Sequence, residues 1–207
     1  RKYRTVYLRG EFVRAELVKL DYVDRDARFD DFDLGDRISI LAGLSPTLFG
    51  LDRTTGMLGA AASRGWRAGE GTLLLPQLTL ESRVGAEADN TIATGSLRFV
   101  HRFRAKLTQT LVSRLEVRRG WDLDPDVQFF ADGSNGVRGY RLREYEGDRT
   151  AVLNVEHRVF SGRELFRMVS PGAAVFFDTG IAASSDRDIR AAALKSDVGI
   201  GLRLTFP

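Results

Sequence analysis

Apolar and polar side chains alternate along this chain with a period of two, and this period constrains the fold more than any other feature. In the segment 197–206, one phase contains Val198, Ile200, Leu202, Leu204 and Phe206, and the other contains Asp197, Gly199, Gly201, Arg203 and Thr205. Successive side chains of a β-strand point to opposite faces of its sheet. The alternation therefore predicts a strand with one apolar face and one polar face.

Similar alternation recurs upstream in the segments 151–159, 111–121, 97–103, 74–81 and 34–44, and more weakly in 54–66 and 5–20. We count about nine segments of roughly 9 to 13 residues, the length that a tilted strand needs to cross a bilayer. No segment shows a convincing period of 3.6 residues, so α-helix is not expected. The sequence predicts an all-β fold.

Three irregularities interrupt this pattern. The segment 5–20 changes phase near Phe12 and Val13, which predicts a bulge or a strand that extends beyond a membrane. Pro76 has no backbone N–H, so a bulge or weakened pairing is expected there. Val100 is an apolar residue on the otherwise polar phase of its segment.

Composition argues against several classes of protein. Arg and Lys total 31 against 28 Asp and Glu, and no basic run is interleaved with aromatic residues, so nucleic acid is not an expected partner. The chain has no cysteine, which leaves neither disulfides nor thiolate metal sites. No apolar run approaches the roughly 20 residues of a transmembrane helix. Strands of a membrane barrel would escape such a test, because their hydropathy alternates.

Residues of catalytic or metal-binding type are few. His101 and His157 are the only histidines and lie on apolar phases, so each is expected to be packed or interfacial. Asp122, Asp124 and Asp126 alternate as calcium ligands do, but the glycine and terminal glutamate of a calcium loop are missing, which favours a solvated turn. No serine, histidine and acid set stands out. We therefore expect no enzyme activity, no metal and no cofactor.

Membrane barrels and soluble sandwiches both show this alternation. The residues of the polar phase are therefore the feature that distinguishes the two folds. The polar phase is rich in Arg accompanied by Glu, and Lys is scarce within the strands, as expected of a charged lumen. The aromatic residues near strand ends, Trp66, Trp121, Phe160 and Phe206, are typical of interfacial girdles. The pattern favours a transmembrane β-barrel.

The run 132–140, Asp-Gly-Ser-Asn-Gly-Val-Arg-Gly-Tyr, predicts a long loop with a specific destination. Its three glycines permit positive φ angles and close backbone approach. Arg138 offers a planar fork of donors that suits a carboxylate. Two candidate carboxylates, Glu156 and Asp178, follow on the polar phases of their own segments.

The tetrapeptide 137–140, followed by Asn-Val-Glu at 154–156 and Phe-Asp-Thr-Gly at 177–180, resembles outer-membrane assembly and translocation barrels of the BamA/TamA type, the bacterial surface antigen family. The resemblance covers the chain from about residue 33 to its end. It implies an antiparallel up-and-down transmembrane β-barrel whose long loop, here about 122–149, folds back into the lumen.

Residue by residue, the resemblance implies a structural loop lock made of Val137, Arg138, Gly139, Tyr140, Glu156 and Asp178. Arg138 corresponds to the arginine of the loop, and Glu156 and Asp178 correspond to its acidic partners on the lumen wall. Gly139 would allow the loop tip to approach the wall. Tyr140 would pack beside it with its hydroxyl hydrogen-bonded.

The resemblance also implies a place and a function. It implies a bacterial outer-membrane protein, not an enzyme, that inserts other outer-membrane proteins or translocates proteins across the membrane. Its partners would be outer-membrane lipids, client outer-membrane or secreted proteins, and accessory proteins of the periplasm. Two alternatives remain open: a barrel that anchors a surface-exposed or secreted hydrolase domain, and a passive anion-preferring pore.

The chain departs from the family in extent. Family members carry periplasmic repeats and further strands, which are not visible here. Residues 1–207 are therefore expected to be one partial barrel domain, an incomplete set of about nine strands from a barrel of about sixteen, because bacterial outer-membrane barrels have even strand numbers.

Overall fold

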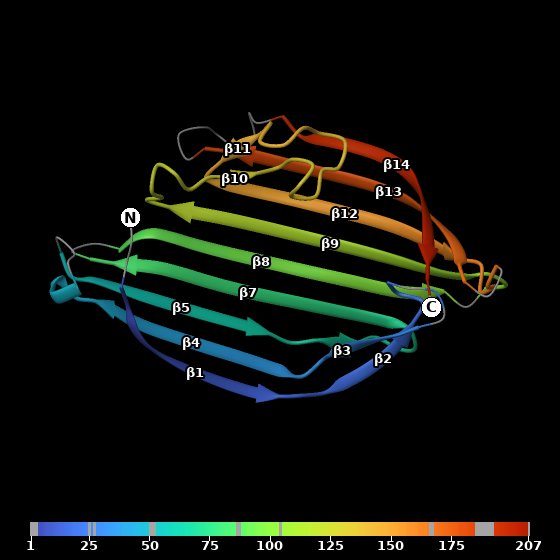
Figure 1. Ribbon diagram of the computed structural model, residues 1–207, viewed down its shortest axis with the longest axis horizontal. Helices are drawn as coiled ribbons and strands as arrows, with labels where there is room; N and C mark the ends of the chain where they lie inside the picture. The colour runs from blue at the N-terminus through green and yellow to red at the C-terminus, as the bar shows by residue number, and fades with distance from the viewer. Residues whose placement is uncertain are drawn as a thin grey trace.

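The structure, a computed structural model, describes residues 4–24, 26, 28–49, 53–85, 88–103, 105–165, 168–184 and 193–206. One large antiparallel sheet dominates it (Figure 1). In hydrogen-bonding order its strands are β1 (Val6–Arg14), β4 (Asp36–Ser45), β5 (Thr55–Ser63), β7 (Thr72–Val84), β8 (Ala88–Phe103), β9 (Thr108–Trp121), β12 (Arg149–Phe160), β13 (Ser170–Ala183) and β14 (Lys195–Thr205). A short strand, β6 (Trp66–Arg67), also pairs with β7.

The all-β, antiparallel prediction is confirmed. The described residues contain one single-turn 3₁₀ helix, Thr47–Phe49, and no helix long and apolar enough to cross a membrane. β1 and β14 stand at the two ends of the strand order, and within the described residues no pairing between them closes the sheet. The described strands form one ten-stranded sheet and two two-stranded sheets, and not the two large stacked sheets of a sandwich.

Two inserts lie on one face of the sheet. The first is a hairpin of β2 (Leu17–Asp21) and β3 (Phe29–Asp33), and the second is the long loop 122–148 between β9 and β12. They lie towards opposite ends of the sheet in Figure 1. We call this the inner face, which carries Glu156 and Asp178, and we call the opposite one the outer face, which carries Ile200 and Leu202.

Large apolar side chains cover the outer face and are exposed. Ile200 and Leu202 of β14 are 84% and 87% exposed. Other exposed members are Val6, Leu8 and Phe12 of β1, Ile38, Ile40 and Leu44 of β4, Leu58 of β5, Leu78 and Leu80 of β7, Leu115 and Val117 of β9, Val175 and Phe177 of β13, and Val198 and Leu204 of β14. These strands belong to one hydrogen-bonded sheet from β1 to β14, so apolar side chains are exposed on the outer face from one edge strand to the other.

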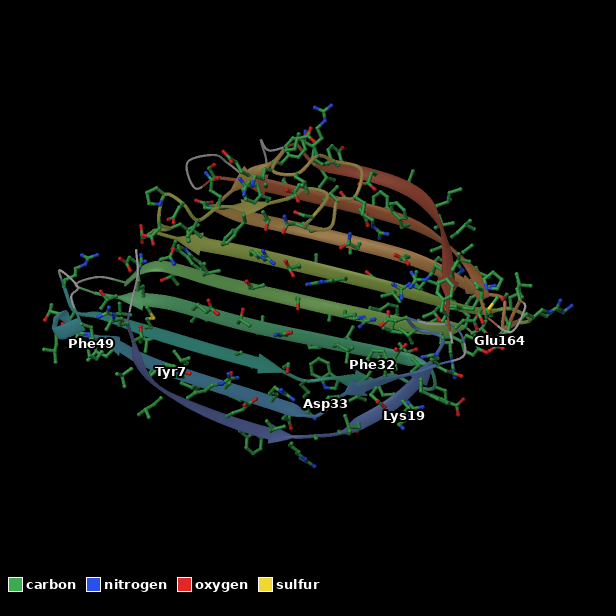
Figure 2. The ribbon with its side chains drawn as sticks, in the orientation of Figure 1. Tyr7, Lys19, Phe32, Asp33, Phe49 and Glu164 are labelled. Atoms are coloured by element: carbon green, nitrogen blue, oxygen red, sulfur yellow. The ribbon has the colours of Figure 1, made fainter. Side chains whose placement is uncertain are left out.

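The β2–β3 hairpin packs on the inner face and makes the main apolar core. Leu20, Val23, Phe32 and Leu34 from the hairpin and its flanks are buried against Leu73, Val100 and Val112 of β7, β8 and β9. Figure 2 labels Lys19 and Phe32 on this hairpin, at the end of the sheet where Glu164 also lies, and Phe49 at the opposite end. The irregular Val100 is thus explained, because it lies beneath the hairpin.

The interpretation of the segment 5–20 was wrong. It is not one strand with a bulge near Phe12 and Val13: β1 runs through both residues to Arg14, and β2 starts at Leu17 as part of the separate hairpin. Leu34, placed by its spacing in the next strand, lies before β4 and is buried in the core. Burying the apolar side chains of the hairpin is more favourable here than continuing β1 as one long strand.

The weakened pairing expected at Pro76 is found. β7 keeps its register with β8 through Pro76, but on its other side β5 ends at Ser63 and β6 begins at Trp66. Pro76 has no N–H to give on this side, and its carbonyl accepts a long hydrogen bond from the N–H of Arg64, at 3.4 Å. The next residue turns away from β7, since the N–H of Gly65 donates to the carbonyl of Leu34 at 3.0 Å.

Candidate functional site

The long loop is shaped by the buried carboxylate of Asp132. Its Oδ1 accepts hydrogen bonds from Ser134 and Asn135, and its Oδ2 accepts one from the backbone N–H of Arg143 at 2.6 Å. Burial alone would raise the pKa of Asp132, but these hydrogen bonds lower it to about 2. Two short strands, β10 (Phe129–Phe130) and β11 (Glu146–Gly147), pair to close the base of the loop.

Arg138 projects from this loop onto two acidic residues of the sheet. Its Nε donates to Oδ2 of Asp178 at 2.8 Å and its Nη2 to Oδ1 at 3.2 Å, which makes a bidentate pair. Its Nη1 donates to Oε2 of Glu156 at 3.2 Å. Burial alone would lower the pKa of Arg138, but the hydrogen bonds and charge of the two acids raise it. The structure brings together the three charged residues that the sequence singled out.

The two acids lie on adjacent strands. Glu156 of β12 and Asp178 of β13 are both on the inner face, and the side chain of Asp178 is 0% exposed. The guanidinium of Arg138 also lies 3.9 Å from the ring centroid of Phe176, two residues from Asp178 on the same face of β13. Arg138 is therefore held both by charge and by cation–π contact.

Asn154 of β12 hydrogen-bonds both to the acidic partner of Arg138 and to the backbone of the loop. Its Nδ2 donates to Oδ1 of Asp178 at 2.7 Å and also to the carbonyl of Gly136 in the loop. Gly136 has φ of +111°, and a Cβ there would lie 2.9 Å from Oδ1 of Asn154. This position therefore requires glycine for its backbone and for its space.

The other tetrapeptide residues fix the loop tip. The N–H of Gly139 donates to Oδ2 of Asp197 at 2.8 Å, and a Cβ on Gly139 would lie 2.8 Å from Cβ of Asp197. The hydroxyl of Tyr140 donates to the carbonyl of Ser196 at 3.3 Å, and its ring packs edge-on against Tyr145.

Val137 provides the apolar part of the contact between the loop tip and the sheet. It is fully buried and packs with Ala131 of the loop and Val152 of β12. The loop tip thus reaches β12 through Val137 and Arg138, β13 through Arg138, and β14 through Gly139.

Glu156 is shared by three arginines. Besides Arg138, its Oε1 accepts from Nε of Arg158 at 2.8 Å and from Nη1 of Arg203 at 2.7 Å. These come from the loop, β12 and β14, so one carboxylate joins the loop to two strands. Glu156 itself is only 8% exposed.

The same arginines hold the turn of the β2–β3 hairpin. Arg158 donates through Nη1 to Oδ1 of Asp24 at 2.8 Å and to the carbonyl of Val23 at 2.6 Å. Arg98 donates to both oxygens of Asp24 at 3.0 Å, and Arg203 to the backbone carbonyl of Asp24 at 3.1 Å. Burial would raise the pKa of Asp24, but Arg158 and Arg98 lower it.

We call the set Asp24, Arg98, Glu156, Arg158 and Arg203 the bridge network. It connects the hairpin insert to the loop insert across the inner face. Sequence reasoning missed this network, because Asp24 falls in a turn-rich stretch and the three arginines share the polar phase with many others. The apolar residues on that phase, of which Val100 is one, were the available signal that something packs on this face.

Three of the remaining candidates, His101, His157 and Asp124, are paired with other side chains. His101 and His157 lie on the outer face, where they bond Thr72 at 2.8 Å and Gln109 at 3.0 Å. The described residues contain no cluster of His, Asp and Glu that could hold a metal ion. Asp124, considered as a calcium ligand, accepts a bidentate pair from Arg83 at 2.6 and 2.8 Å. This ion pair holds the start of the long loop against β7.

Comparisons of the chain with family models, with curated proteins and with solved structures found no match.

Proposed function

We propose that this chain is part of a transmembrane β-barrel of the bacterial outer membrane, with about nine of some sixteen strands, as in even-numbered bacterial barrels. The outer face would contact lipid, and the inner face would line a lumen closed by the two inserts. Its function would be to insert outer-membrane proteins or to translocate proteins, as in the BamA/TamA-type barrels that the loop tetrapeptide resembles. Its partners would be client proteins and periplasmic accessory proteins.

The exposed apolar outer face carries this proposal. A soluble monomer rarely exposes a contiguous apolar patch larger than a few hundred Å² (roughly 300–600 Å²). Here apolar side chains are exposed on strands from β1 to β14, while charged side chains gather on the inner face. Lipid is the solvent that stabilises such a surface.

The locked loop favours assembly or translocation over a passive anion-preferring pore. Arg138 holds the loop over the inner face, and the bridge network holds the hairpin over another part of it. Both inserts would obstruct a lumen. An unobstructed conductance in planar bilayers, with both inserts intact, would contradict this reasoning and favour the pore.

Lipid contact can be tested at two adjacent positions of β14. The chain has no cysteine, so single-cysteine variants can be labelled without background. Ile200→Cys places a label on the outer face, and Gly201→Cys places one on the inner face, where a Cβ meets no atom within 4 Å. In bilayers of brominated lipid we expect strong quenching of a fluorophore at 200 and little at 201. Equal quenching at both positions would contradict the proposed orientation.

The biological function requires a test in cells. Depletion of the full-length protein should lower the amounts of other outer-membrane barrels, or the secretion of a client protein. Wild type and Arg141→Ala, an exposed change in the same loop, should restore them, whereas Arg138→Ala should restore them poorly. Unchanged barrel amounts and unchanged secretion after depletion would overturn the proposal, even if the labelling result holds.

A further inference from the structure

A chamber of about 560 Å³ lies on the inner face between the two inserts. Gly136 and Arg138 line it from the loop, and Arg98 and Arg158, which both bind Asp24 of the hairpin turn, line it from β8 and β12. Arg114 of β9 lines its floor. Four guanidinium groups thus face one chamber.

The negative charge facing this chamber is smaller. Glu156 is the carboxylate among its lining residues, and Asn154 adds a neutral amide. Asp178, which neutralises Arg138, is 0% exposed and lies behind it. The chamber wall therefore presents more positive than negative charge to a solute.

Arg98 and Arg114 make the strongest case for a bound anion. They are direct cross-strand partners on the inner faces of β8 and β9. Like charges placed directly opposite each other destabilise a sheet. Arg98 is held by Asp24 on one side, and Arg114 is held by Glu116 at 2.6 Å on the other. An anion bound between Arg98 and Arg114 would reduce the repulsion between the two guanidinium groups.

Arg114 has capacity for such a ligand. Its side chain is 60% exposed, and Glu116 engages one of its terminal nitrogens. A guanidinium presents five donors in a fixed fork that suits the oxygens of phosphate groups. We propose that the chamber binds a compact, soluble, polyvalent oxyanion of the pyrophosphate class, with Arg98 and Arg114 as its principal ligands.

The test is isothermal titration calorimetry of pyrophosphate into the full-length folded protein in detergent micelles. Saturable binding is expected, and orthophosphate should bind more weakly, because one phosphate group satisfies fewer guanidinium donors. Arg114→Gln should weaken pyrophosphate binding about tenfold, the loss of a charge-assisted hydrogen-bonding group. Glu116→Gln should strengthen it, because Glu116 competes for Arg114.

Arg37→Gln is the matched control. Arg37 lies on the inner face of β4, is 54% exposed, and pairs with Glu11, so its loss changes net charge by the same amount. It should alter binding less than twofold, a factor within ordinary surface effects. Absence of saturable binding, equal binding of both phosphates, or equal weakening by Arg114→Gln and Arg37→Gln would overturn the proposal. The measurement needs neither lipid insertion nor a client protein, so its outcome is independent of the proposed function.

Discussion

Arg138→Ala is expected to release the long loop from the sheet and to lower the free energy of unfolding by about 3 kcal/mol. Removing one partner of a buried ion pair costs roughly 3–5 kcal/mol, because the other charge remains without compensation. Asp178 is that charge, since its side chain is 0% exposed and Arg138 provides its bidentate partner. We use the lower end of the range because the side chain of Arg138 is itself 40% exposed.

The measurement is thermal unfolding in micelles, with mobility in a heat-modifiability gel as a second readout. Arg138→Lys should restore part of the stability, because an ammonium cannot reproduce the bidentate pair and also reach Glu156. Combining Arg138→Ala with Asp178→Asn should recover stability relative to Arg138→Ala, since the stranded charge is gone. Arg141→Ala controls for loss of a loop arginine. Wild-type unfolding of Arg138→Ala would contradict the importance of the pair.

The partners of Arg138 could be named from the sequence because strand phase and the family resemblance pointed to the same two acids. An alternating segment assigns each residue to a face with little ambiguity, so Glu156 and Asp178 could be placed on the same side of neighbouring strands. The resemblance of the tetrapeptide and of the two acidic segments to BamA/TamA-type barrels then implied their contact. The structure shows this contact at hydrogen-bonding distance.

The hairpin insert was not accessible in the same way. β2 falls at the end of the segment 5–20, which its pattern joins to β1, and β3 reads Phe-Asp-Asp-Phe-Asp, which does not alternate. The residues that determine where the hairpin packs lie in other strands. They are Leu73, Val100 and Val112, which form an apolar surface on the inner face. Such residues look like isolated exceptions until the strands are aligned in space.

The bridge network was inaccessible for a different reason. Many arginines occupy the polar phase, and sequence alone does not tell which of them meet one carboxylate. Arg158 and Arg203 lie on β12 and β14, which are separated by β13, and Asp24 is far from both in sequence. Their convergence depends on the twist and register of the sheet and on the position of the hairpin turn.

This convergence has a functional consequence for the proposed barrel. The loop and the hairpin do not contact the sheet independently, because Glu156 binds Arg138 of the loop while Arg158 and Arg203 bind both Glu156 and the Asp24 segment. Displacing one insert would therefore weaken the attachment of the other. A coupled plug of this kind would open as one unit if the lumen accommodates a client segment.

Glu156→Gln tests that coupling. The amide keeps the shape of the side chain but removes the charge that three arginines share. Because Glu156 is 8% exposed, the arginines lose their common partner in a poorly solvated site, and we expect unfolding free energy to fall by about 3 kcal/mol, as when a buried pair is broken. Hydrogen exchange should accelerate both in the loop at 132–140 and in the hairpin turn at 22–24.

Glu116→Gln is the control for this prediction, and Arg203→Gln is the rescue. Glu116 lies on the inner face between Arg114 and Arg118, which are 60% and 36% exposed. Glu116→Gln should cost less than about 1 kcal/mol, as for exposed pairs. Adding Arg203→Gln to Glu156→Gln should restore part of the stability, because it removes one of the charges left in excess. Faster exchange in the loop alone, with the hairpin turn unchanged, would show that the two inserts are held separately.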